Sequence, residues 1–307
     1  MADTAKTSES RPLLGIMLVV LATLAFASAD TTTKHLAALY PAPVIVAIRY
    51  LVNVLLLVVF LGPRLGPRLW QVTRLWLVLA RALCLAIAAI TMALALRLMP
   101  VGEAIAIVYL APILVMLLAM PILGERVSGI GWIGAAFGFI GVLLIARPGG
   151  NLDPLGVTFV LINAAVSTGY HLLTRMLSRT ETTIAMLFHT AWLGAAIFCV
   201  LSIPEFPMPL PPTADIGLML LVGVLMTLGH FLFTAAYREA PAAQLAPVNY
   251  VHLLWAGGLG WLVFGHIPDG WALVGMALVA GAGIVVALST HLKQRREKDE
   301  AAVPIVE

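Results

Sequence analysis

Apolar runs follow one another along nearly the whole chain, and each is broken by Pro, Gly or charged residues. A run holds about 20 residues, which is the length that an α-helix needs to cross the hydrocarbon core of a bilayer. We therefore predict an all-α polytopic membrane protein with ten transmembrane helices. The predicted limits are 13–36, 43–61, 73–96, 102–122, 128–146, 155–177, 182–203, 214–237, 242–264 and 270–290.

The charge content excludes a soluble protein. Only 11% of the 307 residues are charged and 61% are apolar, whereas soluble domains carry roughly 25% charged residues. We therefore expect the lipid bilayer to surround most of the surface. The net charge of +3 does not indicate a nucleic-acid partner, because the basic residues lie in short loops and in the tail KQRREK instead of on one face.

Neither the cysteines nor the N-terminus indicates a secreted or metal-binding protein. Cys84 and Cys199 lie inside apolar runs, so we expect no disulfide, no metal and no cofactor. The first run follows Arg11 and contains Ala27-Ser28-Ala29, which imitates a signal peptide with its cleavage site. Because every later run is equally apolar, we expect this first run to be retained as a helix.

The positive charges predict the side of the membrane on which each loop lies. With the N-terminus in the cytoplasm, loops on that side hold 13 of the 18 Lys and Arg residues. The opposite loops hold only Lys34, Arg97 and Arg147, and Arg49 and Arg81 lie within helices. The positive-inside rule therefore favours ten helices with both termini cytoplasmic. The thirteen are Lys6, Arg11, Arg64, Arg68, Arg74, Arg126, Arg175, Arg179, Arg238, Lys293, Arg295, Arg296 and Lys298.

The chain also repeats itself at an offset of 141 residues. Without gaps, this offset aligns Leu77 with Leu218, Arg97 with Arg238, Pro100 with Pro241, Tyr109 with Tyr250 and Gly124 with Gly265. The repeat divides the chain into a domain at 1–150 and a second domain at 151–307, each with five helices. Because five is odd, the second unit enters the membrane upside down. Many secondary transporters have this architecture, with the substrate held near the midplane between the halves.

The fourth predicted helix and its surroundings carry a recognisable signature. It contains Glu103-Ala104, Tyr109 and Pro112, ends at Gly124-Glu125, and precedes a helix with Gly131, Gly134, Gly138 and Gly141. This pattern resembles the EamA-type members of the drug/metabolite transporter superfamily, and the resemblance extends from about residue 13 to 290. The second copy departs from the pattern, because His266 stands at the position of Glu125 and Leu253 at that of Pro112.

The resemblance implies secondary transport of small metabolites, often export, across a bacterial inner membrane. Members of the family move amino acids, nucleosides, sugars, vitamins and cationic drugs. Amino-acid exporters of the YddG kind are the relatives that we favour. The resemblance thus implies a small-molecule substrate and the lipid bilayer as partners, and we expect a monomer.

Ionisable groups inside the apolar runs need a reason, because each costs roughly 2.5–3.5 kcal/mol on insertion scales. Asp30 and Arg49 are predicted to lie at the same depth on adjacent helices, where they would form an outer gate, a substrate site or a structural ion pair. The first two predicted helices align with the sixth and seventh at an offset of 140 residues, which places Tyr170 at the position of Asp30 and His189 at that of Arg49. We predict that this second polar pair contributes to the substrate site. Glu103 opens the fourth helix, either as a capping group or as a gate. Arg81 is expected to snorkel.

The ninth predicted helix is the most polar. Asn249, His252 and Trp255 are three residues apart and therefore share one face, with Tyr250 beside them. Together with Tyr109 of the fourth helix they would line a substrate cavity, or they would only form hydrogen bonds between helices. Tyr109 and Pro112 mark mid-depth of the fourth helix, where a proline makes the backbone bendable.

The motifs that are missing narrow the function. No P-loop, GxSxG, HExxH or paired-Cys pattern occurs, which argues against ATP-driven transport and an enzyme. Few Lys or Arg residues lie within the spans, which argues against phosphorylated cargo. We predict a secondary-active or facilitative exporter of small neutral or zwitterionic metabolites, with Met and hydrophobic or aromatic amino acids as leading cargo. Another metabolite or drug-like amine is the alternative within transport, and a membrane-embedded enzyme or channel is the alternative outside it.

Overall fold

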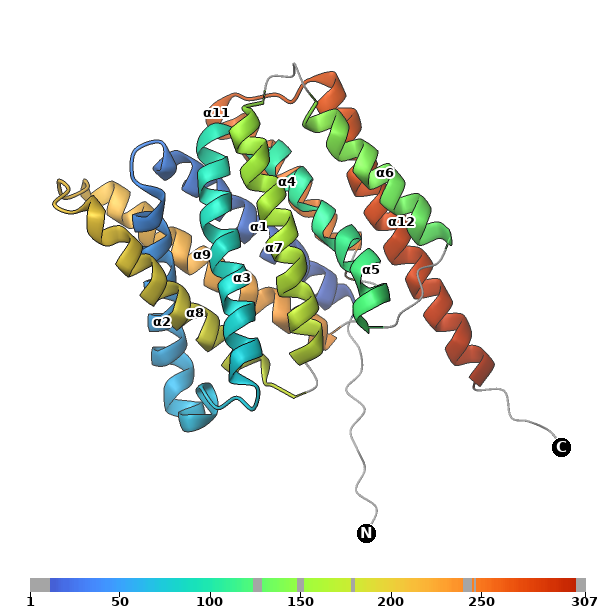
Figure 1. Cartoon of the computed structure of the whole chain (residues 1–307), viewed down its shortest axis with the longest axis horizontal. Helices are drawn as coiled ribbons and strands as arrows, with labels where there is room; N and C mark the ends of the chain where they lie inside the picture. The colour runs from blue at the N-terminus through green and yellow to red at the C-terminus, as the bar shows by residue number, and fades with distance from the viewer. Residues whose placement is uncertain are drawn as a thin grey trace, which may run out of the picture.

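The computed structural model describes residues 12–123, 129–147, 152–177, 180–239, 245 and 247–301, and nearly all of them are helical (Figure 1). The first half contains α1 (Pro12–Ala37), α2 (Ala42–Leu65), η1 (Gly66–Leu69), α3 (Leu75–Leu98), α4 (Val101–Val108), α5 (Leu110–Leu123) and α6 (Gly129–Ile145). The second contains α7 (Pro154–Leu177), α8 (Thr183–Ser202), η2 (Ile203–Glu205), α9 (Thr213–Glu239), η3 (Pro247–Tyr250), α11 (Val251–Phe264) and α12 (Gly270–Ala301).

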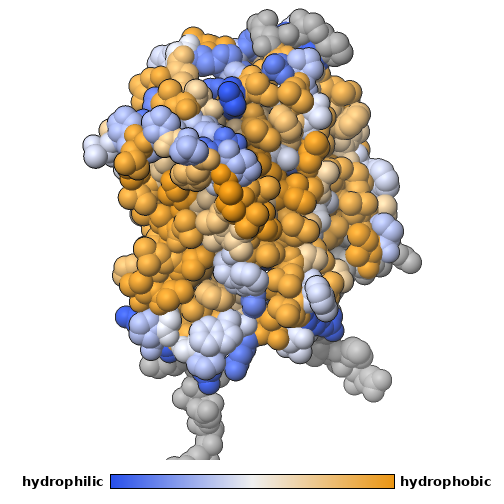
Figure 2. Space-filling model, turned by 60° about the vertical axis from the view of Figure 1, so that its left-hand side comes forward, coloured by the Kyte–Doolittle hydropathy of each residue, from blue (hydrophilic) through white to orange (hydrophobic). Residues whose placement is uncertain are grey.

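The prediction of ten membrane-spanning segments is confirmed within the described residues. Seven helical segments have at least 18 residues and are apolar enough to cross a bilayer, and α4 and α5 together make one of them. Three shorter apolar helices, at Gly129–Ile145, Val248–Phe264 and Gly270–Val286, complete the set. Figure 2 shows the result on one face of the molecule, where apolar residues cover the middle and hydrophilic residues gather toward both ends.

The loops between helices lie at two ends of the bundle, which we call the terminal end and the distal end. At the terminal end α1 begins and α12 finishes; at the distal end α1 turns into α2 and α6 into α7 (Figure 1). The helix α1 runs from the terminal to the distal end, whereas α7, the first helix of the second half, runs the opposite way. The second half is therefore inverted relative to the first, as an odd number of spans per half requires.

The two halves pack against each other more than within themselves. Corresponding helices meet across the molecule, because α2 packs against α8, α4 against α11 and α6 against α12. The helix α1 packs mainly on α9, and α3 on α7, so the first and third helices of the halves also exchange partners. The largest buried cluster accordingly draws residues from both halves, with α4 at its centre.

Glycines permit the closest of these contacts. A side chain at Gly141 of α6 would approach the carbonyl oxygen of Gly275 of α12 to 2.7 Å, so the two backbones touch where neither residue has a Cβ. Gly265 ends α11 with a φ of 65° and donates its N–H to the carbonyl of Trp261. Glycine adopts this left-handed conformation without steric cost. Its aligned residue, Gly124, lies outside the described residues, as do Glu125 and Pro241.

Candidate substrate site

Two tyrosines that the repeat aligns meet at the centre of the molecule. Tyr109 interrupts the fourth span, because α4 ends at Val108 and α5 begins at Leu110. Tyr250 ends η3, directly before α11. Their ring centroids lie 4.8 Å apart, with an angle of 37° between the ring planes. The contact between two equivalent residues marks the axis that relates the halves.

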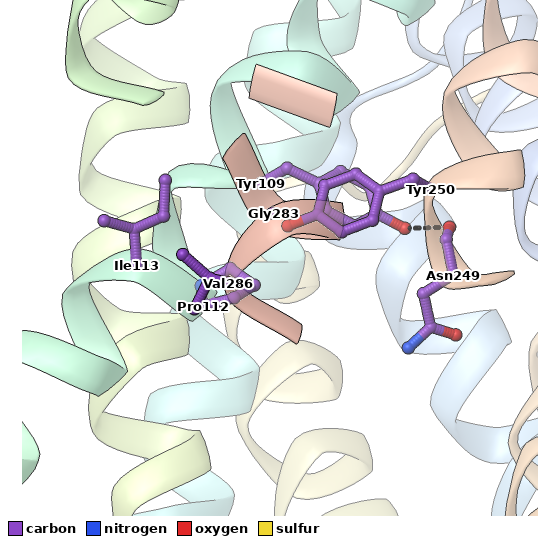
Figure 3. A pocket seen from close by; sticks show the side chains of 7 residues that line it. All are labelled: Tyr109, Pro112, Ile113, Asn249, Tyr250, Gly283 and Val286. Carbon is purple, nitrogen blue, oxygen red and sulfur yellow. Dashed lines mark hydrogen bonds between the residues drawn. The ribbon is translucent and has the colours of Figure 1, made fainter. Parts of the chain in front are cut away.

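A proline stands beside each of these breaks. Pro112 follows Tyr109 by three residues, and Pro247 precedes Tyr250 by three residues. Proline has no N–H to donate, and its ring clashes with the carbonyl four residues earlier, which explains why the fourth span cannot continue as one regular helix. The Tyr109 hydroxyl donates a hydrogen bond to the main-chain carbonyl oxygen of Asn249, at 2.6 Å (Figure 3). The two breaks are therefore tied together.

A cavity of about 160 Å³ opens beside the tyrosine pair (Figure 3). It lies between α5, η3 and α12. Its lining consists of Tyr109, Pro112, Ile113, Asn249, Tyr250, Gly283 and Val286. Gly283 matters for its shape, because a Cβ there would lie 1.5 Å from the Tyr250 hydroxyl. The Tyr250 phenol thus rests directly on the backbone of α12.

The predicted stripe on the ninth span carries unused hydrogen-bonding capacity. Asn249 Oδ1, His252 Nε2 and Trp255 Nε1 are all buried, and each has no hydrogen-bond partner within the described part of the chain. An unpaired buried polar group typically costs about 1–3 kcal/mol. One of the three residues, Asn249, also lines the cavity, so these atoms are candidates for binding the polar groups of a ligand.

Asp30 of α1 joins this stripe. Its side chain is buried, and its Oδ2 lies 3.6 Å from His252 Nε2. The Phe26 ring, one turn earlier, lies 6.3 Å from the His252 ring. His252 therefore faces a carboxylate and an aromatic ring from the opposite half of the molecule.

The predicted direct ion pair between Asp30 and Arg49 is wrong. Among the described residues no nitrogen of Arg49 lies within 4.0 Å of the Asp30 carboxylate, whose nearest basic group is His252. The Arg49 guanidinium lies 5.4 Å from the ring centroid of its neighbour Tyr50 instead. The reason is the exchange of partners between halves: α1 packs mainly on α9 and α11, whereas α2 packs mainly on α8 and α9.

Tyr170 belongs to a separate polar cluster around Arg81. The Arg81 Nη2 donates to the Tyr170 hydroxyl at 2.7 Å, and its Nε donates to Thr174 Oγ1 at 2.7 Å. Its Nη1 donates to Thr190 Oγ1 and to the Met186 carbonyl oxygen. Arg81 is only 3% exposed, so the prediction that it snorkels is wrong. The neutral oxygens of α7 and α8 hold its charge inside the bundle instead.

His189 has a structural role away from the cavity. Its Nδ1 accepts a hydrogen bond from Trp192 Nε1 at 2.8 Å, and its Nε2 lies 2.9 Å from the Trp70 carbonyl oxygen. An indole N–H only donates and a carbonyl only accepts, which requires the neutral tautomer with its proton on Nε2. His189 and Tyr170 have different partners, so the predicted polar pair between them is wrong.

Glu103 lies near the distal end of α4 and is only 2% exposed. Its Oε1 is 2.7 Å from His266 Nε2, in the loop after α11. Lys34 of α1 lies nearby and donates to the carbonyl oxygens of Leu96 and Met99, each at 2.9 Å. The sequence patterns did not predict that His266 and Lys34 lie beside Glu103. The only sequence feature that pointed to Lys34 was its position in the last turn of the first apolar run.

The comparisons with known proteins agree with this architecture. A sequence profile described as "EamA-like transporter family" matches residues 13–147 and 154–288, one copy for each half. The chain belongs to the EamA-like transporter family. A solved crystal structure superposes with a TM-score of 0.61 at 20% identity, covering 94% of this chain and 98% of that one. At that identity the likeness shows the fold alone.

Curated relatives of this EamA-like transporter act on different compounds. A riboflavin transporter of Rhizobium johnstonii is 27% identical, over 96% of this chain and 99% of that protein. The pseudopaline exporter CntI of Pseudomonas aeruginosa is 25% identical, over 89% and 95%. An S-adenosylmethionine uptake transporter of Rickettsia bellii is also 25% identical, over 94% and 97%. The chain is therefore a multi-pass membrane transporter of small metabolites and not an enzyme.

Proposed function

We propose that this EamA-like transporter exports small zwitterionic metabolites by alternating access, with hydrophobic and aromatic amino acids as leading cargo, as in YddG-like exporters. Transport is secondary-active or facilitative. One observation carries the proposal: three buried side-chain atoms of the ninth span have no hydrogen-bond partner among the described residues, and one of them, His252 Nε2, lies 3.6 Å from the Asp30 carboxylate. In lipid, such groups persist where a ligand or water completes their hydrogen bonds.

The chemistry of these groups suits both ends of an amino acid. The Asp30 carboxylate and Asn249 Oδ1 are acceptors, which match the three donors of an ammonium group. Trp255 Nε1 is a donor, and so is His252 Nε2 in the tautomer that carries its proton there; both match a carboxylate. The aromatic rings of Tyr109 and Phe26 provide an apolar wall for the side chain.

The size and charge of the site favour a small cargo. The cavity of about 160 Å³ is smaller than the roughly 300–1,000 Å³ of sites for drug-sized ligands. A phosphate would require free guanidinium groups, but Arg81 already donates to four neutral oxygens. A larger metabolite or a drug-like amine is the second candidate, which the riboflavin-transporting relative favours. That cargo would require the cavity to widen.

The charges support an orientation for export. We place the terminal end in the cytoplasm of a bacterial inner-membrane protein, because the loops at that end hold most of the Lys and Arg residues. The cavity opens on the terminal side of the tyrosine pair. Cytoplasmic substrate would then load from this side and leave at the distal end.

A transport assay in liposomes tests the cargo. Purified protein is tested with labelled Met, Phe and Trp, with and without a pH gradient, and with unlabelled competitors. We expect saturable transport that free amino acids inhibit, whereas N-acetylated amino acids and amino-acid amides, which each lack one charge, inhibit at least tenfold less well. Inhibition by riboflavin but by no amino acid would overturn the cargo, and ion conductance without saturation would overturn the carrier mechanism.

A variant pair sharpens the same assay. Asp30→Asn keeps the shape of the side chain but removes the charge that we assign to ammonium recognition, so the KM should rise about tenfold or more. Leu254→Ala is the matched control, because Leu254 lies on α11 but is 73% exposed on the lipid-facing side. An equal effect of both variants on KM would remove the support for Asp30 as the ammonium site.

A further inference from the structure

The distal halves of the two broken spans form a closed wall. Every residue of α4 from Val101 to Ile107 is buried. A Cβ added to Gly102 would lie 3.3 Å from the Cα of Gly257 on α11, so the two helices almost touch. This wall lies between the distal surface and the tyrosine pair. No substrate passes it while α4 and α11 stay together.

The cavity lies on the other side of the tyrosine pair. Gly283 and Val286 line it, and they are 13 and 16 residues after the distal start of α12 at Gly270. At a rise of 1.5 Å per residue this places them about 20–24 Å from the distal end. The described half of the fourth span on this side, α5, packs on α6 and α7. The molecule is thus sealed distally, and its cavity lies toward the terminal end.

Glu103 lies at the distal end of this wall, and a helix-capping hydrogen bond does not explain its buried position. A glutamate at the third position of a helix commonly bonds back to the N–H of the N-cap residue. Here the N-cap is Pro100, which has no N–H, and no side-chain cap hydrogen bond forms. The carboxylate reaches across to His266 instead, at 2.7 Å. Its second oxygen, Oε2, is buried without a partner among the described residues.

We propose that the contact between Glu103 and His266 is the latch of a distal gate. The latch joins α4 of the first half to the loop after α11 of the second half, which are the two elements that must separate for release. Lys34 of α1 stays near Glu103 and anchors the end of α3 through the Leu96 and Met99 carbonyls. Breaking the latch therefore shifts the population toward a state that is open at the distal end.

The proposal rests on the alternating access proposed above but not on the identity of the cargo, so its test uses no substrate. In a background with Cys84→Ala and Cys199→Ala, a reporter cysteine replaces Ile107, which is fully buried one turn below Glu103. A membrane-impermeant maleimide is added to the distal side of oriented membrane vesicles. We expect slow labelling in the parent and labelling about tenfold faster with His266→Ala or Glu103→Gln.

A matched control separates a latch from general loosening of the surface. Arg147→Ala breaks a different distal polar contact, the Arg147–Asp269 ion pair of 2.8 Å, which links the end of α6 to the start of α12. This variant should leave labelling of position 107 at the parent rate. A second reporter, Ile113→Cys in the cavity, should react from the terminal side in the parent and more slowly once the latch is broken.

The outcomes that overturn the proposal are specific. Parent-rate labelling of position 107 in both latch variants would show that Glu103 and His266 only anchor the loop. Equally fast labelling in Arg147→Ala would show that any distal contact has this effect. His266 is a loop residue with a 36% exposed side chain, so its variant is expected to fold. Failure of amino-acid transport in the liposome assay would leave these labelling results unaffected.

Discussion

The fourth and ninth spans have the same backbone plan but different chemistry. Both break at an aligned tyrosine, and both place a helix, α4 or α11, on the distal side of the break. The polar stripe of the ninth span, Asn249, His252 and Trp255, aligns with Val108, Ala111 and Leu114 in the fourth. The duplication therefore sets the scaffold and the symmetry axis, whereas the polar stripe occurs in only one copy.

The prolines differ in the same way. Pro112 follows its tyrosine and Pro247 precedes its own, so each break is produced by a different local sequence. The two breaks lie at aligned positions although the prolines beside them do not align. This suggests that the interruption of the helix matters more than the sequence that produces it. An interrupted helix exposes backbone and side-chain polar groups at mid-depth, where a transporter needs them.

The largest effect on transport is expected at Gly283, because the Tyr250 ring occupies the space that a Cβ at this position would need. In Gly283→Ala the new Cβ would overlap the Tyr250 ring and hydroxyl, the nearest atom being 1.5 Å away. Overpacking of this kind costs about 1–3 kcal/mol or more and displaces the ring. We expect transport to fall at least tenfold and the thermal midpoint to drop by several degrees. Gly281→Ala is the control, because a Cβ there meets nothing within 4 Å. Equal behaviour of the two variants would contradict this packing of Tyr250 against Gly283.

A smaller effect on transport is expected from variants of the polar stripe, which we compare with a variant at the aligned apolar position in the fourth span. Asn249→Ala and His252→Ala each remove one hydrogen-bonding group, and a bond to a charged ligand group contributes about 1.5–3 kcal/mol. The KM should therefore rise about tenfold or more for each. Val108→Ala, at the position aligned with Asn249, should change the KM by less than about twofold, because it removes no polar contact. If both stripe variants leave transport kinetics unchanged, the binding site lies elsewhere.

Periodicity and the repeat were sufficient for the architecture. The apolar runs predicted the ten spans, and the 141-residue offset paired Tyr109 with Tyr250, which the structure brings to 4.8 Å. The spacing of Asn249, His252 and Trp255 also predicts a shared helical face. Because Asn249 lies in η3 and the other two lie in α11, that shared face stays a prediction. These features depend on local sequence or on duplication, and both can be read from one chain.

The partners across helices could not be predicted in this way. Asp30 was paired with Arg49 on the assumption that consecutive helices are neighbours, but α1 faces α9 and α11 instead. The contact between Glu103 and His266 joins residues 163 positions apart, and no alignment by the repeat relates them. Gly283 has no sequence signal beyond its small size. Side-chain partners depend on how the halves interlock, which hydropathy does not specify.

The smallest effect is expected on thermal stability and concerns the ion pair between Arg147 and Asp269, which also occurs in only one copy. Arg147 and Asp269 align with Leu288 and Ser128, so the ion pair has no charged counterpart. The hydrogen bond from Arg147, followed by that from the Ala272 N–H, lowers the pKa of Asp269 from 3.8 to about 2. Because folding lowers this pKa, the stabilisation is present above pH 3.8 and is lost as the pH falls toward 2.

Thermal midpoints of the parent and of Asp269→Asn should thus differ by a small constant amount from about pH 7 to pH 5 and converge between about pH 4 and pH 2. A difference that stays constant down to pH 2 would show that the charge of Asp269 does not stabilise the distal loop, and that the asymmetry between the copies there has no energetic consequence.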